Sequence, residues 1–477
     1  MVSHHIFYQL VLLGLLWLFM MLHVMWPSDR PALAPRPPQP VAPPRKRSKE
    51  PKPFAGLLHK PHCEACEQVI EPHLEPPAAV PPRIVCLRGR PRTVPTTYHF
   101  CPHPDCAYYG WAGRGNLQAN GHPSGGLWRQ FYCTACDGYF LETHGTPLQS
   151  KRVAPEKLGW AVSALAEGLG IRAVARVFEV DPNTVLAWLV EVAEHAAAFS
   201  RYFLHDVHVT QVQLDELFAL LRAVKRGEVS EVEAVERLSR PPHWVWAAID
   251  PVTKLLLTVA VGDRTLAMAQ RVVHQVVQVL APDCVPLFLT DGFKAYTTAL
   301  LAHFGSWVQL PRRQATGPAP KPRWMPLPQL LYAQVIKTVR RRRLVRVKYR
   351  VVFGTLERVN QVLAACGWQI NTAFVERLSL TIRQHVAAVG RRVSTLCKGE
   401  AGLRQQLALY HIYYNFCLPH ASVRLPLPQP EPTNGSGSAR QWRPCTPAMA
   451  AGLTDHVWTL REVLLFRVPP WSQPAGV

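Results

Sequence analysis

The sequence predicts a multidomain α+β protein in which a cysteine-rich module and a helical segment precede an α/β domain. Three patterns support this. Close cysteine pairs gather within residues 60–147, helical periodicity runs over 154–199, and strand-like and helical patterns alternate over 205–310. The length of 477 residues accommodates two or three domains of roughly 100–200 residues each. Apolar residues make up 48%, enough for a sizeable core, which excludes a wholly disordered chain.

The charge balance favours a polyanionic partner. The chain carries 53 Lys and Arg against 32 Asp and Glu, a formal net charge of +21. An excess of one sign on this scale indicates nucleic acid more often than a merely solubilising surface.

Twelve cysteines are too few and too unevenly placed for a secreted disulfide scaffold. Their close pairs favour metal binding in a reducing compartment.

The N-terminal residues 1–26 are predicted to form an apolar helix. The run over 6–26 is long enough for one membrane span of about 20 residues. A cleavable signal peptide is the alternative, but no Lys or Arg precedes the run and no small-residue cleavage site follows it clearly. A misassigned start, with an unimportant segment, is another. Residues 27–59 read as a Pro-rich basic linker, and their positive charge would keep the remainder cytoplasmic.

Four cysteines in the predicted module at 60–147 have zinc-ligand spacing, as Cys101-x4-Cys106 and Cys133-x2-Cys136. Two such pairs brought together by a β-hairpin, for which GLWRQFYC is suited, give the tetrahedral site of a zinc ribbon. Four thiolates leave no open position, so this zinc is structural rather than catalytic. The alternative is four unpaired buried cysteines.

A third pair, Cys63-x2-Cys66, lies upstream, with His62, His73 and Cys86 nearby. It indicates a second zinc site only if those neighbours complete the ligand set, and the sequence leaves this open.

The segment at 151–200 has the rhythm of a helix-turn-helix, although an ordinary helical pair has the same pattern. A first helix is expected over 156–168. Asp181 is placed to cap the last helix, with Pro182 at its first position. On that recognition helix Asn183 and Thr184, with Ala187, are expected to face outward toward DNA. The expected apolar positions are Ile171, Val174, Ala175, Phe178, Val185, Trp188 and Leu189.

The region 205–425 is predicted to be an RNase H-like catalytic domain. Strands are expected over 207–214, 244–249, 255–261 and 285–290, with a helix over 265–280. The second and third strands should pair as a hairpin. Strand, hairpin, helix, strand is the order of that fold.

Two carboxylates follow predicted strands: Asp215 after the first and Asp291 after the fourth. Cleavage or joining of a phosphodiester is served by two Mg²⁺ ions about 3.5–4 Å apart, held by carboxylates on rigid elements. A third acid should come from a later helix, where Glu357 and Glu376 are both candidates. Most helical glutamates are solvated surface residues. The same applies to Glu216, which flanks Asp215, and Asp250 reads as a hairpin-turn residue.

Two further segments have no assigned role. A basic, Pro-rich insertion is expected over 311–350, and residues 426–477 form a C-terminal tail. Within 425–447 the NGSGS run indicates a surface loop.

Several motifs, in order, resemble those of DDE-type bacterial insertion-sequence transposases with an N-terminal zinc ribbon and helix-turn-helix. They are LDELFALL with Asp215, WAAID, VGDRT, LTDGFKAY with Asp291, NTAFVERLSLTIRQ with Glu376, LALYHIYYNFCLPHASVR and TPAMAAGLTDHVW. The resemblance covers about residues 98–465. One departure is Ser379, where the family's Glu-Arg motif often continues with Asn.

The resemblance implies Mg²⁺-dependent (or Mn²⁺-dependent) cleavage at transposon ends and strand transfer into target DNA. It selects Glu376 as the third acid and leaves Glu357 in reserve. Asp215 and Asp291 would bridge two ions, and Glu376 would complete one of them. The phosphate contacts it implies come from Lys294, Arg377 and Arg383.

The resemblance also implies a homo-oligomer, at least a dimer, acting on double-stranded DNA at the bacterial chromosome in the cytoplasm. Two other functions stay open. A catalytically decayed transposase would survive as a sequence-specific DNA-binding protein or repressor. A membrane-anchored sensor rests on residues 6–26 alone.

Overall fold

The computed structural model describes residues 75–80, 98–219, 243–311, 320–341, 343–390, 399–432 and 438–473. The predicted apolar helix, the linker and the third cysteine pair, with its neighbouring histidines and Cys86, lie outside these residues. Within the described stretches, no helix combines the length and hydrophobicity that a membrane span requires.

The cysteine module contains a small antiparallel sheet. Its strands β1 (Leu117–Ala119), β2 (Gln130–Cys133) and β3 (Tyr139–Leu141) pair in chain order, and a 3₁₀ turn, η2 (Pro123–Gly125), lies between the first two. The expected hairpin is therefore present as β2 and β3. The cysteines pack with Phe131 and Phe140 in a small core separate from the main one.

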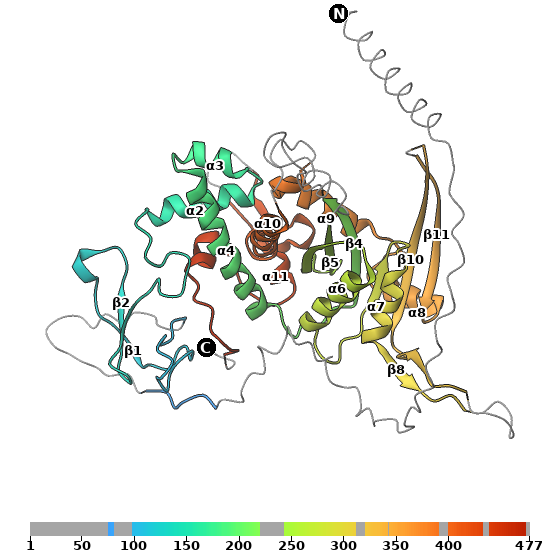
Figure 1. Ribbon diagram of the computed structural model, residues 1–477, viewed down its shortest axis with the longest axis horizontal. Coiled ribbons are helices and arrows are strands. Elements are labelled where there is room, and N and C mark those ends of the chain that lie inside the picture. Colours follow the sequence, from blue (N-terminus) through green and yellow to red (C-terminus); the bar gives the residue numbers. More distant parts are fainter. Residues whose placement is uncertain are drawn as a thin grey trace, which may run out of the picture. The chain divides into compact units, whose positions relative to one another are not determined.

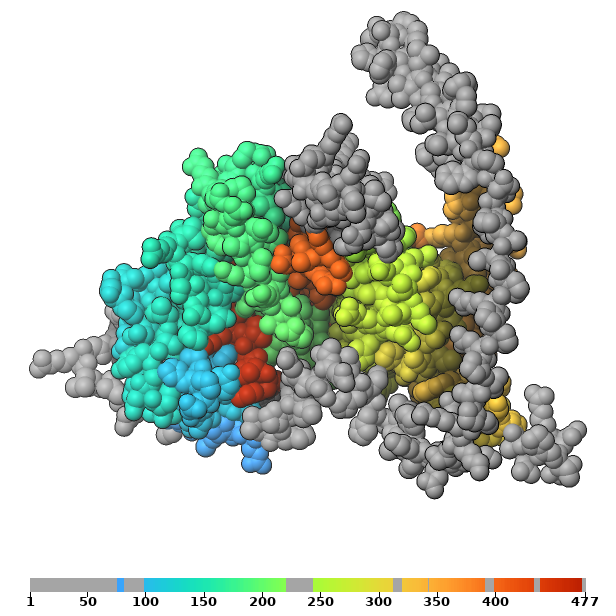
Figure 2. Space-filling model, viewed as in Figure 1, coloured from blue at the N-terminus to red at the C-terminus, as the bar shows by residue number. Residues whose placement is uncertain are grey.

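Three helices follow: α2 (Pro155–Ala166), α3 (Ile171–Val177) and α4 (Pro182–Phe203). The predicted cap is confirmed, because the Asp181 carboxylate accepts a hydrogen bond from Asn183 N at 2.8 Å and Pro182 is the first helical residue. The apolar positions of the predicted face pack into the core. In Figure 2 these helices, coloured teal to green, reach the surface. Their buried faces join one core with the sheet that follows.

The central sheet has six strands in the order β11-β10-β7-β4-β5-β6 (Figure 1). β4 (Gln211–Ala219) pairs antiparallel with β5 (His243–Ile249), which pairs antiparallel with β6 (Leu256–Gly262) as expected. On its other side β4 pairs parallel with β7 (Leu287–Thr290). β7 in turn pairs parallel with β10 (Leu331–Arg340). This mixed order is consistent with an RNase H-like domain.

Helices cover both faces of the sheet, because successive residues of each strand point to opposite sides. On one face α6 (Leu266–Val279) and α7 (Ala295–His303) pack on strand residues such as Leu214 and Phe288. On the other, α8 (Leu356–Ala364) packs on β7 and β10. There α9 (Ala373–His385) and α10 (Glu400–Ile412) pack on β4, β5 and β6. The short 3₁₀ turn η3 (Ala387–Val389) follows α9.

Two predictions of irregular structure are wrong. The supposed insertion over 311–350 contains β10, a strand of the central sheet, and most of its antiparallel partner β11 (Arg343–Phe353). It also contains β9 (Arg323–Pro326), which pairs with β8 (Gly305–Val308). The supposed loop over 425–447 contains β12 (Leu425–Glu431) and β13 (Arg440–Arg443). In both cases proline and arginine content hid strands that gain their stability from pairing.

The C-terminal residues pack against the body of the chain. After α10 come a π-helical turn, η4 (Tyr413–Cys417), and a 3₁₀ turn, η5 (Ala421–Val423). Two short helices, α11 (Pro447–Ala450) and α12 (Leu460–Leu465), add to the main core. Beyond them Arg467 is buried, and its guanidinium donates to Phe100 O at 3.0 Å in the cysteine module.

Candidate active site

Asp215 and Asp291 lie next to each other on neighbouring parallel strands. The pairing of β4 with β7 ends at Leu214 and Thr290, and each aspartate is the next residue of its chain segment. Carboxylate oxygens of Asp215, Asp291 and also Glu216 lie within 4.8 Å of one another. One expectation changes. β4 does not end at Asp215, because β5 continues to pair with it as far as Ala219.

Glu376 lies in the first turn of α9, which packs on β4 and β5. The fully buried amide of Gln213 fixes the start of this helix. Gln213 Nε2 donates to Asn371 O at 3.0 Å, and Gln213 Oε1 accepts from Val375 N at 3.2 Å. Gln213 lies two residues before Asp215 and therefore on the same face of β4. The Thr372 hydroxyl also donates to Glu376 Oε1, at 2.5 Å. β4 thus carries Asp215 and also positions α9, the helix that carries Glu376.

Crowding of the carboxylates shifts their proton affinity. Burial, followed by the charges of Asp291 and Glu376, raises the pKa of Asp215 to about 6. Burial and the charge of Asp291 raise the pKa of Glu216 to about 7. Such clustering of hard oxygen donors suits a divalent cation, whose charge offsets their mutual repulsion.

Two basic side chains balance these acids. Arg264 forms ion pairs with Glu216 at 3.0 Å and with Asp291 at 3.1 Å. Its guanidinium also stacks over Phe293, 4.2 Å from the ring centroid. Lys337 on β10 forms an ion pair with Glu376. Arg264 therefore links the buried Glu216 side chain to the second aspartate.

The other two acids considered from sequence lie elsewhere. Glu357 is exposed in the first turn of α8, outside the carboxylate cluster. Asp250 is buried and caps the β5–β6 turn, since its carboxylate accepts from Val252 N and Thr253 N at 3.0 Å each. Its predicted role as a turn residue is confirmed.

The four cysteine sulfurs of Cys101, Cys106, Cys133 and Cys136 lie within 4.8 Å of one another. The Cys101–Cys136 and Cys106–Cys133 Sγ–Sγ distances are 3.6 and 3.8 Å. A tetrahedral zinc with Zn–S bonds of about 2.3 Å needs sulfurs about 3.8 Å apart. Asn116 Nδ2 also donates to Cys133 Sγ at 3.3 Å, which favours the thiolate. The donor set therefore fits a structural zinc ion.

The expected DNA contacts differ in availability. Asn183, Thr184, Lys294 and Arg377 are exposed. Arg383 is half-buried, and its guanidinium donates to Val389 O at 3.1 Å and to Phe218 O at 3.4 Å. It thereby ties α9 to the end of β4.

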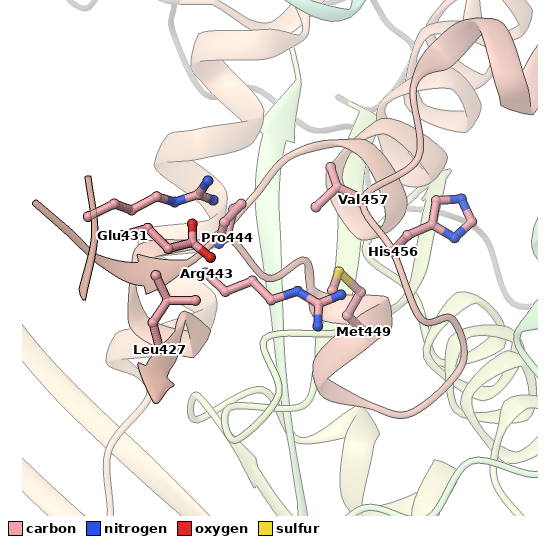
Figure 3. A pocket seen from close by; sticks show the side chains of 8 residues that line it. Leu427, Glu431, Arg443, Pro444, Met449, His456 and Val457 are labelled. Carbon is pink, nitrogen blue, oxygen red and sulfur yellow. The ribbon is translucent and has the colours of Figure 1, made fainter. Parts of the chain in front are cut away.

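A hollow of about 300 Å³ lies away from these acids (Figure 3). It is formed by residues of β12, β13, α11 and the segment after α11, including Glu431, Arg443, Met449 and His456. None of its lining residues belongs to the carboxylate site.

Sequence reasoning missed Gln213, Arg264 and Lys337 as parts of the site. Arg264 stood in the quoted VGDRT motif without a role. Lys337 stood in the supposed insertion, where the alternation of LYAQVIKTV was the signal for a strand.

Comparison with known proteins adds little. No family model and no curated protein matches the chain. One similar solved structure is the Mos1 Strand Transfer Complex, 14% identical over 31% of this chain and 53% of that one, with a TM-score of 0.12. Another is the Mos1 transposase paired-end complex with left transposon end, 12% identical over 55% and 77%, with a TM-score of 0.15. At these values the likeness carries no argument, and the fold assignment rests on strand order.

Proposed function

We propose that this protein is a DDE-type transposase that cleaves DNA at transposon ends and joins them to target DNA. The observation that carries the proposal is the cluster of Asp215 and Asp291 where β4 and β7 lie side by side. Glu376 lies outside that cluster, on α9, but near enough for its charge to raise the pKa of Asp215. Carboxylates on two adjacent strands and a neighbouring helix are an arrangement that can hold the ions of a two-metal phosphoryl transfer.

Asp215 and Asp291 are the proposed shared ligands of two Mg²⁺ or Mn²⁺ ions, and Glu376 is the third ligand. When bound, such ions activate the attacking oxygen and stabilise the leaving one. Water attacks phosphorus, and the bond from phosphorus to the 3′ oxygen breaks to release a 3′-hydroxyl. That hydroxyl then attacks a target phosphodiester, so one P–O bond forms as another breaks. Exposed Lys294 and Arg377 are proposed to hold the phosphates in line.

The N-terminal elements supply recognition of the element ends. Asn183 and Thr184 are exposed at the first turn of α4, where a recognition helix contacts bases. The cysteine module would hold structural zinc. Acting on paired ends requires a homo-oligomer, at least a dimer.

The test is a strand-transfer assay with the element's own terminal DNA and Mg²⁺. The wild-type chain should form product, and Asp291→Ala should form none while still binding the ends. Glu376→Gln should abolish product and Glu357→Gln should not. Loss of product in Glu357→Gln but not in Glu376→Gln would make Glu357 the third metal-binding carboxylate instead.

A decayed transposase that acts only as a DNA-binding protein or repressor is the alternative. It predicts specific binding of the ends with no product from the wild type in Mg²⁺ or Mn²⁺. The exposed positions on α4 serve both functions equally, so only the chemical assay separates them.

A further inference from the structure

The hairpin formed by β10 and β11 continues past the rest of the sheet. β7 pairs with β10 only over Leu331–Gln334, and from Val335 to the tip β10 pairs with β11 alone. Figure 1 shows the two strands running on beyond their neighbours. Six residues at about 3.3 Å each give this ribbon a length of roughly 20 Å. That spans about six base pairs of duplex DNA at 3.4 Å each.

The ribbon is strongly basic. Residues 331–353 contain eight Lys or Arg and no Asp or Glu. Every described residue from Lys337 to Arg350 is exposed. Arg340 is the register partner of Arg343, and like charges directly opposite each other destabilise a hairpin. A solvated surface has no reason to keep such repulsion, whereas a polyanion relieves it.

Three of the basic residues, Arg346, Lys348 and Arg350, share one face of the ribbon. Arg346 and Lys348 pair with Thr338 and Ile336, and side chains of paired residues point to the same side. Arg350 continues this face and donates to Gln334 Oε1 at 2.5 Å. In the described part of the chain, neither Arg346 nor Lys348 has an ion-pair partner. The opposite face carries Lys337, which pairs with Val347, and Tyr349.

The ribbon starts at the carboxylate site. Lys337, its first basic residue, pairs with Glu376. Ile336 lies beside Gly292, where an added Cβ would be 3.5 Å from Ile336 Cγ1. The base of the ribbon is therefore adjacent to the carboxylate site.

We propose that this ribbon is a DNA-binding arm that holds the phosphate backbone of the duplex flanking the reacting bond, through Arg346 and Lys348. A two-stranded β-ribbon fits the major groove of B-DNA, and its basic face then meets the phosphates at the groove wall. That the polyanion is DNA rests on the proposed function, whereas binding of a polyanion by the ribbon does not.

The test measures the affinity of the full chain for a labelled random-sequence duplex over a range of salt concentrations. Each phosphate contact contributes about 0.9 to the slope of log K against log salt. The variant Arg346→Gln/Lys348→Gln should reduce the slope by about two. Two controls should leave it unchanged. Val347→Thr/Tyr349→Thr alters the opposite face. Arg201→Gln/Arg404→Gln removes the same charge from exposed sites elsewhere, of which Arg404 forms an ion pair with Glu400.

An unchanged slope in the hairpin variant, with native circular dichroism, overturns the proposal. An equal loss of slope in Arg201→Gln/Arg404→Gln also overturns it, because the effect would then come from the net charge of the protein rather than from a phosphate contact of the ribbon. The chemical assay is read separately. If the variant loses slope but the wild-type chain forms no strand-transfer product, the DNA-binding arm is kept and the transposase chemistry is rejected. If the wild-type chain forms product but the variant keeps its slope, only the arm is rejected.

Discussion

Gln213 and Val375 are hydrogen-bonded across the contact between β4 and α9, with 3.2 Å between Gln213 Oε1 and Val375 N. The same amide also donates to Asn371 O. The strand that carries Asp215 therefore fixes the position and orientation of the start of the helix that carries Glu376. An error in this contact displaces one acid relative to the other two.

Gln213→Leu should lower the turnover rate by a large factor with little change in the DNA dissociation constant. The substitution leaves the buried N–H of Val375 and the half-buried carbonyl of Asn371 unpaired, which costs about 1–3 kcal/mol of stability. Gln211→Leu is the matched control. Gln211 is also buried on this face of β4, and its Oε1 has no hydrogen-bond partner among the described residues. Equal loss of turnover in both variants would contradict a positioning role.

The sequence singled out Asp215 and Asp291 because the first follows an alternating strand pattern and the second follows an apolar strand, and the structure brings the two carboxylates together. The end of the first strand was misjudged, since charged Asp215 and Glu216 resemble a strand end. Only pairing with β5 keeps them within β4. Glu376 needed the family resemblance, because a single glutamate on an amphipathic helix does not differ from a surface residue.

The contacts that position the acids were beyond sequence reasoning for a different reason. Gln213 meets α9, and Arg264 meets Asp291, only after the chain has folded, across separations of 158 and 27 residues. Polar side chains at such positions have no local pattern that predicts their partners. β10 did have a pattern, but the arginine run beside it indicated an exposed insertion.

Arg264→Met should destabilise the fold, because Glu216 then loses its ion-pair partner while its side chain stays 1% exposed. Breaking a buried pair costs about 3–5 kcal/mol, and the one-third exposure of Arg264 reduces this to about 2 kcal/mol. Adding Glu216→Gln should restore most of the loss. Urea unfolding of the four members of this cycle is the measurement. Additive effects of the two substitutions would contradict the coupling.

Asp215→Asn should stabilise the metal-free protein at neutral pH. The pKa of this acid is about 6 in the folded chain against an ordinary 3.8, so the folded state binds the proton more tightly. The wild-type chain then loses stability as the pH rises from about 4 to about 6, and at neutral pH the loss is roughly 3 kcal/mol. The gain from Asn should be present above pH 6 and vanish toward pH 4.

Thermal unfolding in Mg²⁺-free buffer over this pH range tests the sign. Glu357→Gln serves as the control, because that carboxylate is exposed. Addition of Mg²⁺ should stabilise the wild-type chain and have less effect on Asp215→Asn. Equal responses of the two to Mg²⁺ would remove Asp215 from the proposed ligands.

Loss of zinc should unfold the cysteine module locally. Its core is separate from the large core that α2 to α4 share with the sheet. Cys133→Ser should therefore lower the zinc content and expose residues 98–147 to protease while the near-UV circular dichroism of the six-stranded sheet domain persists. Cys366→Ser, at a half-exposed thiol outside the cluster, is the control. Identical melting with and without a chelator would argue against a bound zinc ion.

Arg467 provides the last prediction, since it joins the C-terminal segment to the cysteine module. Its guanidinium donates to Phe100 O at 3.0 Å and to His144 Nδ1 at 2.9 Å. It also lies over the Phe100 ring, 4.4 Å from the centroid. Burial lowers the pKa of this guanidinium to about 10, so the charge is retained at neutral pH but poorly hydrated.

Arg467→Ala should cost about 2–3 kcal/mol, because it leaves a buried carbonyl unpaired and opens a cavity between Phe100 and Phe140. Arg461→Ala is the matched control. Arg461 forms an ion pair with Glu156 at 3.0 Å, but both side chains are exposed, so its loss should cost at most about 1 kcal/mol. Proteolysis of residues 98–147 and zinc release should accelerate in Arg467→Ala alone. Similar acceleration in both variants would mean that charge, rather than the buried contact, secures the module.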